Sequence, residues 1–228
     1  MADESLAERI AAAARAMEGE TNPSDTMERS LALVGQLVPG AQEAGFSMLH
    51  RGRAVDTPAA TSDLVVRIDQ LQYESQQGPC LDAIWESEVV RSPDIGSDDR
   101  WPTWGPRVVD DTGMRSVLCF RLFTHGDRLG ALNLYSRQSD AFDEADVEHG
   151  LAMAAHSAIA VSAALEVEHL KVGMDRRTVI GQAQGILMER FDMDSEHAFA
   201  LLTRLSSHSN RKLREIALEI VETRRLPD

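Results

Sequence analysis

Residues 177–221 read RTVIGQAQGILMERFDMDSEHAFALLTRLSSHSNRKLREIALEIV. Apolar residues recur three and four positions apart in three stretches of this segment, a pattern typical of helices that each bury one face. Polar residues separate the stretches: Asp194 or Ser195 is expected to cap the second helix, and Ser209 or Asn210 the third. The segment therefore predicts a small three-helix bundle.

Positive charge gathers within this bundle. Residues 197–214 contain no Asp or Glu, and they include Arg204, Arg211, Lys212 and Arg214. The whole chain of 228 residues is acidic, with 23 Lys and Arg against 37 Asp and Glu and a net charge of -14. Residues 172–228 hold 9 of each kind, which leaves 14 basic and 28 acidic residues for the rest. This separation predicts two modules, of which only the C-terminal one suits a polyanion.

The turn before the third helix, residues 206–212, is the strongest candidate for that contact. Free backbone N–H groups at a helix N-terminus favour phosphate, and hydroxyls, an amide and two cations lie beside them here. Arg204 is expected to face the same spot, and Ser207, Asn210 or Gln182 to touch a base edge. An alternative interpretation stays open, in which the turn only caps the helix and its cations are solvated.

The bundle sequence also resembles a known family. The AQGILMER run, the acidic cap followed by HAFALL, and the string SSHSNRKLREIA match the ANTAR domain in order and spacing, over residues 172–226. This domain is an RNA-binding output module of bacterial transcription antiterminators. The resemblance implies binding to paired hairpins with small loops in nascent messenger RNA, whose unpaired bases a protein can read. It places the RNA-binding surface on six residues: Gln182, Arg204, Ser207, Asn210, Arg211 and Lys212.

Upstream of the bundle, the pattern changes to short strands. Residues 115–123 and 128–135 form the clearest strand pair, with Gly126 and Asp127 in the turn between them. Further strands are expected at 44–50, at 53–58 after a turn near Gly52, and at 88–91; helices are expected at 6–17, 24–38, 62–70, 80–86 and 106–111. This order predicts an antiparallel sheet with flanking helices, an α+β domain.

This region resembles the GAF domain, a small-molecule sensor fold, over residues 24–165. The matching strings are QQGPCLDAIWESEVVRSPDI, RWPTW and GMRSVLCFRLFTHGDRLGALNLYSRQSDAFDEAD. GAF domains bind cyclic nucleotides, haem, bilins or amino acids, and many bind nothing known, so the cofactor stays unassigned. The resemblance implies a pocket between the sheet and residues 92–113. Its candidate lining residues, for which plain core packing is the alternative, are Cys80, Trp101, Trp104 and Arg115.

Residues 142–191 predict one nearly unbroken helix. Apolar residues recur at every seventh position: Leu151, Ala158, Leu165, Val172, Val179 and Ile186. The row four residues earlier in each heptad begins apolar and turns polar: Val147, Ala154, Val161, Glu168, Asp175 and Gln182. A sustained period of seven favours pairing with the same helix of a second copy over at least part of the length. The other interpretation is a long helix that lies on its own domain.

Together these patterns predict an α+β chain with four parts: an N-terminal helical extension (1–23), a GAF-like sensor domain (24–165), a helical linker (166–175) and a three-helix ANTAR-like domain (176–228). The main hypothesis is a dimeric regulator that binds RNA stem-loops in messenger leaders and prevents transcription termination. The alternative is a small-molecule or redox sensor whose tail mediates protein contact. Binding to DNA through a helix pair is a third hypothesis, which the neutral tail disfavours.

Other classes of protein fit the sequence poorly. No catalytic motif or metal-ligand spacing occurs, so no catalytic or metal site is assigned and the chain is not expected to be an enzyme. The two cysteines, Cys80 and Cys119, are expected to be buried. Residues 1–17 lack the pattern of a signal peptide, and no stretch is expected to span a membrane, which predicts a cytoplasmic protein.

Overall fold

The computed structural model describes residues 6–50, 54–125 and 127–227. The predicted turn residues Gly52 and Gly126, the first residue of the strand expected at 53–58, and the first five residues of the chain lie outside the described residues. The chain divides into two compact units, Met1–Glu166 and Val167–Asp228, which we call the first and second units. Each unit is considered by itself below.

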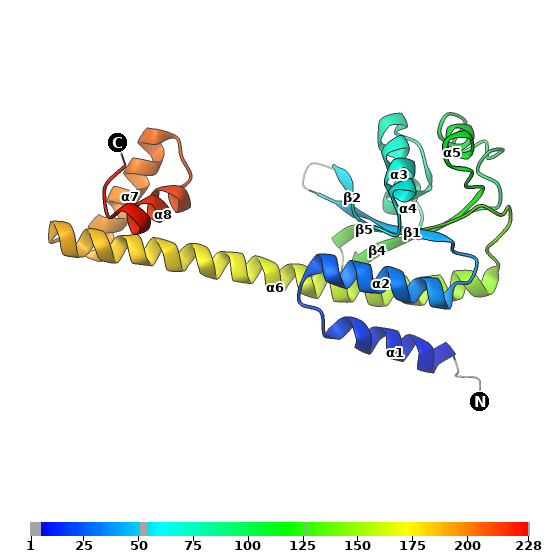
Figure 1. Ribbon diagram of the computed structural model, residues 1–228, viewed down its shortest axis with the longest axis horizontal. Helices are drawn as coiled ribbons and strands as arrows, with labels where there is room; N and C mark the ends of the chain where they lie inside the picture. Colours follow the sequence, from blue (N-terminus) through cyan, green and yellow to red (C-terminus); the bar gives the residue numbers. More distant parts are fainter. Residues whose placement is uncertain (1–5, 51–53, 126, 228) are drawn as a thin grey trace. The chain divides into compact units, whose positions relative to one another are not determined.

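The first unit is built on a five-stranded antiparallel sheet (Figure 1). The strand order is β2-β1-β5-β4-β3, so the hairpin partners β4 and β5 lie inside the sheet. All five predicted strands are present, and the predicted α+β architecture is confirmed. The strands are β1 (Glu43–Leu49), β2 (Val55–Ala60), β3 (Val89–Ser92), β4 (Ser116–Thr124) and β5 (Asp127–Ser136).

Successive side chains of a strand point to opposite faces of the sheet, so the core of this unit has two layers, one on each face. In β4, Leu118 and Phe120 face a layer formed with α1, α2 and the beginning of α6, whereas Val117 and Cys119 face a layer formed with α3, α4 and α5. Figure 1 shows these two groups of helices on opposite faces of the sheet. The helices are α1 (Leu6–Glu18), α2 (Pro23–Leu37), α3 (Asp63–Ser75), α4 (Pro79–Trp85), α5 (Trp104–Thr112) and α6 (Glu144–Phe191).

Local signals explain where the helices on the sheet begin and end. The side chain of Asn22 accepts a hydrogen bond from the Ser24 N–H at 2.9 Å and caps α2, with Pro23 in its first turn. α4 likewise begins at a proline, Pro79. α3 is longer than predicted and ends where Gln76 adopts a left-handed conformation with φ of 53°. In the added turn, Gln72 is fully buried and its side chain donates to Asp69 at 3.0 Å, so this end of α3 is packed inside the unit.

The first part of α6 packs closely on the sheet. A Cβ atom added to Gly150 would lie 2.2 Å from the Phe120 ring, so glycine allows this close approach. Ala154, Ala158 and Val161, which belong to the two heptad rows, are buried in the layer against the sheet. In this half of the helix, the buried residues of the seven-residue repeat therefore pack in the core of the helix's own domain.

The expectation that no stretch could span a membrane is wrong by length and composition. Within the described residues, α6 is the one helix long and apolar enough to pass that test. Its apolar part is also the part that carries Met153, Ala154 and Val161, all buried against the sheet. In the apolar window of α6, 39% is buried within the structure, and a helix that packs on its own domain can match a membrane span in composition.

The second unit contains the end of α6 together with α7 (Ser195–Ser209) and α8 (Leu213–Thr223). These three helical stretches enclose one apolar core: Ala183, Leu187, Ala198, Leu202, Ile216, Ala217 and Ile220. The predicted cap of α7 is confirmed, because the carboxylate of Asp194 accepts a hydrogen bond from the His197 N–H at 2.8 Å. The predicted three-helix bundle is thus present, with its first helix continuing from α6.

Candidate functional site

The turn between α7 and α8 differs from the prediction in where the helices meet. α7 continues through Ser209, and Asn210 closes it in a left-handed conformation with φ of 52° and its N–H bonded to the Ser206 carbonyl. Lys212 occupies the N-cap position of α8. The expectation that Ser209 or Asn210 caps the third helix is therefore wrong. The turn is instead fixed by Ser206, whose carbonyl accepts the Arg211 N–H at 3.1 Å and whose hydroxyl donates to the Arg211 carbonyl at 2.5 Å.

The six residues predicted to bind RNA are all exposed. Five of them occupy the C-terminal half of α7 and the turn that follows: Arg204, Ser207, Asn210, Arg211 and Lys212. Gln182 lies elsewhere, on α6, where it lines a hollow of about 740 Å³ together with residues that include Arg190 and Arg224. Within the described residues, no hydrogen bond or ion pair joins Gln182 to the other five.

The charges around the turn are not free of acidic neighbours. Arg211 Nη1 lies 2.7 Å from Glu219 Oε2, because α8 brings a carboxylate from two turns further along the chain back to the turn. Among the described residues, Arg204, Lys212 and Arg214 have no such ion pair. The prediction of a cationic patch without carboxylates is therefore wrong for Arg211, which pairs with Glu219. It agrees with the structure for the three cations that have no ion pair among the described residues.

The four residues predicted to line a sensor pocket do not surround one cavity. Trp101 and Trp104 are buried and meet edge to face, with ring centroids 5.6 Å apart. Cys80 is also fully buried, and burial raises the pKa of its thiol. Arg115 lies apart from them: its guanidinium is exposed, pairs with Asp94 at 2.6 Å and donates to the Ser139 hydroxyl.

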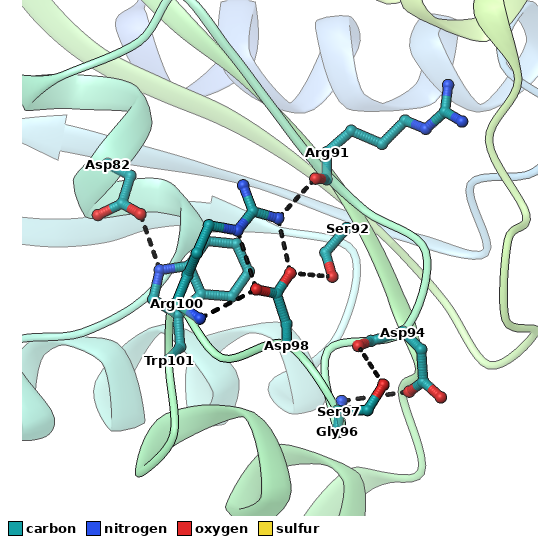
Figure 2. A network of polar contacts seen from close by, with 9 residues as sticks. All are labelled: Asp82, Arg91, Ser92, Asp94, Gly96, Ser97, Asp98, Arg100 and Trp101. Carbon is teal, nitrogen blue, oxygen red and sulfur yellow. Dashed lines mark hydrogen bonds and ion pairs between the residues drawn. The ribbon is translucent and has the colours of Figure 1, made fainter.

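A surface network holds Trp101 in place (Figure 2). The Arg100 guanidinium lies 4.4 Å from the Trp101 ring centroid and donates to Asp98 at 2.6 Å. The Ser92 hydroxyl donates to the same carboxylate, also at 2.6 Å. The hydrogen bonds from Arg100 are the largest of several effects that lower the pKa of Asp98 to about 2. On its other side, Trp101 donates from Nε1 to Asp82 at 2.8 Å.

Asp82 connects this network to a cavity of the first unit, a hollow of about 550 Å³. The cavity has two aromatic and two acidic side chains in its wall, with aliphatic groups and an amide between them. Its lining residues are Ala54, Val55, Tyr73, Gln76, Leu81, Asp82, Trp85 and Glu86. Arg128 approaches the ring of Trp85, with 5.7 Å between the guanidinium carbon and the ring centroid.

Behind the cavity lies a buried polar cluster that was not predicted from the sequence. The carboxylate of Asp69 is fully buried and accepts hydrogen bonds from Thr57 at 2.8 Å, Tyr135 at 2.9 Å, Gln72 at 3.0 Å and Ser47 at 3.2 Å. Burial raises the pKa of Asp69 to about 6, and the hydrogen bonds oppose this rise. No cation pairs with Asp69 among the described residues.

Tyr73 joins this cluster to the cavity. It lines the cavity, and its hydroxyl donates to Ser47 at 3.1 Å and lies 2.9 Å from the Thr57 hydroxyl. Asn133 donates to the same Ser47 hydroxyl at 2.8 Å, and its own Oδ1 is buried without a hydrogen-bond partner. A ligand that contacts Tyr73 would therefore act on a chain of hydrogen bonds that reaches β1, β2 and β5.

Comparison with known families and structures agrees with the division of the chain into two units. The GAF domain family matches residues 20–162 and the ANTAR domain family matches residues 168–221. No curated protein matches the chain. A free methionine-R-sulfoxide reductase from Neisseria meningitidis, solved with its substrate, is 16% identical, with a TM-score of 0.55 over 71% of this chain and 90% of that one. A GAF domain of a phosphoenolpyruvate-protein phosphotransferase from Coxiella burnetii is 13% identical, with a TM-score of 0.57 over 71% and 95%. At these identities the likeness concerns the fold alone.

Proposed function

Because the chain belongs to the GAF domain family and carries an ANTAR domain after the GAF domain, we propose that it is an antitermination regulator that binds hairpin loops in the leaders of nascent messenger RNA. The GAF domain supplies a sensor input and the ANTAR domain the RNA-binding output. Such a regulator acts in the cytoplasm, where transcripts emerge, and needs no catalytic site. The likeness to the reductases concerns the fold alone, and burial raises the pKa of both thiols, Cys80 and Cys119, which disfavours thiolate chemistry.

The observation that carries this proposal is the exposed turn between α7 and α8. It gathers Arg204, Ser207, Asn210, Arg211 and Lys212 on one end of α7, and none of these side chains is needed by the bundle core. Cations position a phosphate backbone, while an amide and a hydroxyl can read a base edge. Nine basic and nine acidic residues in 172–228 give no extended basic face, so a compact loop suits this surface better than a long duplex.

The test compares two matched double variants in binding to an RNA with two small-loop hairpins. Arg211→Ala with Lys212→Ala removes two cations from the turn, whereas Arg176→Ala with Arg177→Ala removes two exposed cations from α6. We expect the turn variant to lose hairpin binding and the α6 variant to retain it, with unchanged melting of both. Equal losses in both would indicate nonspecific charge attraction, and full binding by the turn variant would refute the site.

We further propose that the cavity of the first unit holds the sensor ligand. Tyr73 offers an aromatic face, Trp85 adds a ring that already has the Arg128 guanidinium 5.7 Å from its centroid, and Asp82 and Glu86 offer carboxylates. Together these suit a small molecule with a cationic group beside an apolar part. Trp101, predicted from the sequence, acts here through its hydrogen bond to Asp82. Melting of the protein with a panel of amines and amino acids tests this proposal. A ligand at 100 times its Kd should add about 2.7 kcal/mol of stability, and Trp85→Ala should abolish the effect.

A homodimer through α6 is part of the same proposal. The first half of this helix carries Leu151 and Ile159 with 37% and 62% of their surface exposed, at the edge of a hollow that they line with residues of β4. Further along, Leu170 and Met174 are 61% and 67% exposed. Large apolar side chains at this spacing on an exposed helix favour pairing with a second helix. The pairing face is therefore proposed to lie beside the buried heptad residues, where these four exposed apolar side chains lie.

A further inference from the structure

Phe199 is an aromatic residue that the bundle core does not use. It lies on α7 with 45% of its surface exposed, and it is absent from the apolar residues that form or flank the core of the second unit. No ring or cation contact to Phe199 occurs among the described residues. Its neighbours in sequence, Ala198 and Leu202, are fully buried, so Phe199 projects from the side of the helix and not from its packed face.

The same side of α7 leads to the turn proposed to bind RNA. Thr203 follows Phe199 by four residues, and its hydroxyl donates to the Phe199 carbonyl at 3.0 Å. Ser206 follows by seven residues, which is close to two full helical turns, so it lies on the same face about 10 Å along the helix, and Asn210 closes α7 four residues later. The residues between Phe199 and Asn210 contain no Asp or Glu, and Lys212 lies just beyond. The face thus runs from a phenyl ring through hydroxyl and amide groups to a cation.

We infer that Phe199 is a stacking platform for one unpaired base of the hairpin loop, an inference that rests on the proposed RNA binding. A hairpin loop presents bases that are free of pairing partners, and proteins commonly stack such bases on exposed aromatic rings. The phosphates on either side of that base would follow the face toward Lys212, where the positive charge matches them. The exposed residues one turn before and one turn after the ring are Glu196 and Thr203, and neither extends the apolar surface that a protein partner would need. The side of the ring toward Thr203 and Lys212, away from Glu196, therefore suits a base and its phosphates.

The experiment measures hairpin binding of the full chain with a fluorescent base analogue, 2-aminopurine, at each loop position in turn. Phe199→Ala is compared with Phe191→Ala, a matched control in the same unit. Phe191 is 42% exposed, but the Arg190 guanidinium already lies 5.7 Å from its ring centroid. Phe199→Trp and Phe199→Leu complete the set, because tryptophan keeps a π surface and leucine keeps only apolar area.

We expect Phe199→Ala to weaken hairpin binding about 5- to 150-fold, the range for one base stacked on an aromatic ring. One loop position should lose its fluorescence quenching in this variant, Phe199→Trp should restore it, and Phe199→Leu should not. Phe191→Ala should bind like the wild type. If the wild type binds the hairpin and Phe199→Ala binds equally well, the inference is overturned and the proposed function stands. If the wild type binds no hairpin, both are overturned, and dissociation of a dimer by Phe199→Ala would assign the ring to a contact between copies.

Discussion

Replacing Glu219 by Gln should strengthen RNA binding, although Glu219 lies outside the stretch that the sequence marks as cationic. Its carboxylate holds the Arg211 guanidinium at 2.7 Å and places a negative charge beside the turn. A glutamine keeps the size of the side chain and its ability to accept a hydrogen bond, but it removes this charge. The substitution therefore frees Arg211 for a phosphate and removes a repulsion at the same time.

The geometry sets the size of the effect. A phosphate bound on the far side of the Arg211 guanidinium would lie about 7 Å from the Glu219 carboxylate, where two unit charges in water interact by about 0.6 kcal/mol. This energy corresponds to about a threefold gain in affinity at low salt. Screening at about 0.15 M salt should reduce the gain to less than twofold. Folding stability should change by no more than about 1 kcal/mol, because the Arg211 and Glu219 side chains are 41% and 35% exposed and solvent screens their attraction.

Fluorescence anisotropy with a labelled hairpin at 20 mM and 150 mM salt, concentrations chosen for the assay, measures both the gain and its screening. The matched control is Glu222→Gln, which removes the same charge from an exposed position about 4.5 Å further along α8 and without an ion pair among the described residues. Its gain should be smaller than that of Glu219→Gln. Unchanged or weaker binding by Glu219→Gln, with the fold intact, would refute the idea that Arg211 contacts RNA.

Three further predictions concern the two units separately. Because the pKa of Asp69 is raised from 3.8 to about 6 in the folded state, its contribution to stability is full below pH 4 and is lost as pH rises through about 6. The difference is about 3 kcal/mol, and urea titrations at several pH values should show that Asp69→Asn removes this dependence; an identical pH profile in the variant would contradict the assignment. Leu202→Ala should cost the second unit about 2–5 kcal/mol because Leu202 is fully buried, and hairpin binding should fall with the melting of that unit while the first unit melts as before. Ile159→Asp should convert a dimer to a monomer in light scattering without unfolding, and a dimer that survives would exclude this face of α6 as the seam.

The parts of the fold that are predictable from the sequence depend on residues close together in the chain. The strands β4 and β5 are both rich in apolar residues and are adjacent in the chain, so their pairing is a local property. Asp194 caps α7 through the backbone N–H only three residues ahead. The bundle follows from three amphipathic stretches with short connections, which leave few ways to bury their apolar faces.

The turn between α7 and α8 shows where residue type alone is insufficient. Asn favours both the position before a helix and the left-handed position that closes one. Here Ser209 remains inside α7, with its hydroxyl bonded to the Leu205 carbonyl at 2.7 Å, and Asn210 closes the helix. Glu219 was missed for a different reason. It reaches Arg211 only because α8 folds back beside the turn, and the charge pattern along the sequence does not show this.

The long helix presents a conflict between two explanations of one repeat. A row of apolar residues every seven positions suits a seam with a second helix and equally suits a helix that crosses a sheet. Burial of Ala154, Ala158 and Val161 assigns the first half of the repeat to the domain core. Exposure then becomes the useful signal, because Leu151 and Ile159 are large apolar residues of this half of α6 that stay exposed. The candidate dimer contact on α6 thus consists of the apolar residues that remain when those buried in the domain core are set aside.

The buried cluster around Asp69 depends on contacts that are distant in sequence. Its carboxylate receives donors 12, 22 and 66 residues away, from Thr57, Ser47 and Tyr135 on three different strands. A buried carboxylate without such donors would cost several kcal/mol, so no single residue of the set explains its own position. The available signal was the placement of polar residues on strands that are otherwise apolar. Ser47 in β1 and Asn133 in β5 alternate with buried apolar neighbours that face α1, α2 and α6, which places both on the face covered by α3, α4 and α5, where only a polar partner could satisfy them. Polar residues at buried strand positions therefore point to the buried cluster that Tyr73 joins to the cavity, which the predicted residues Trp101 and Trp104 did not indicate.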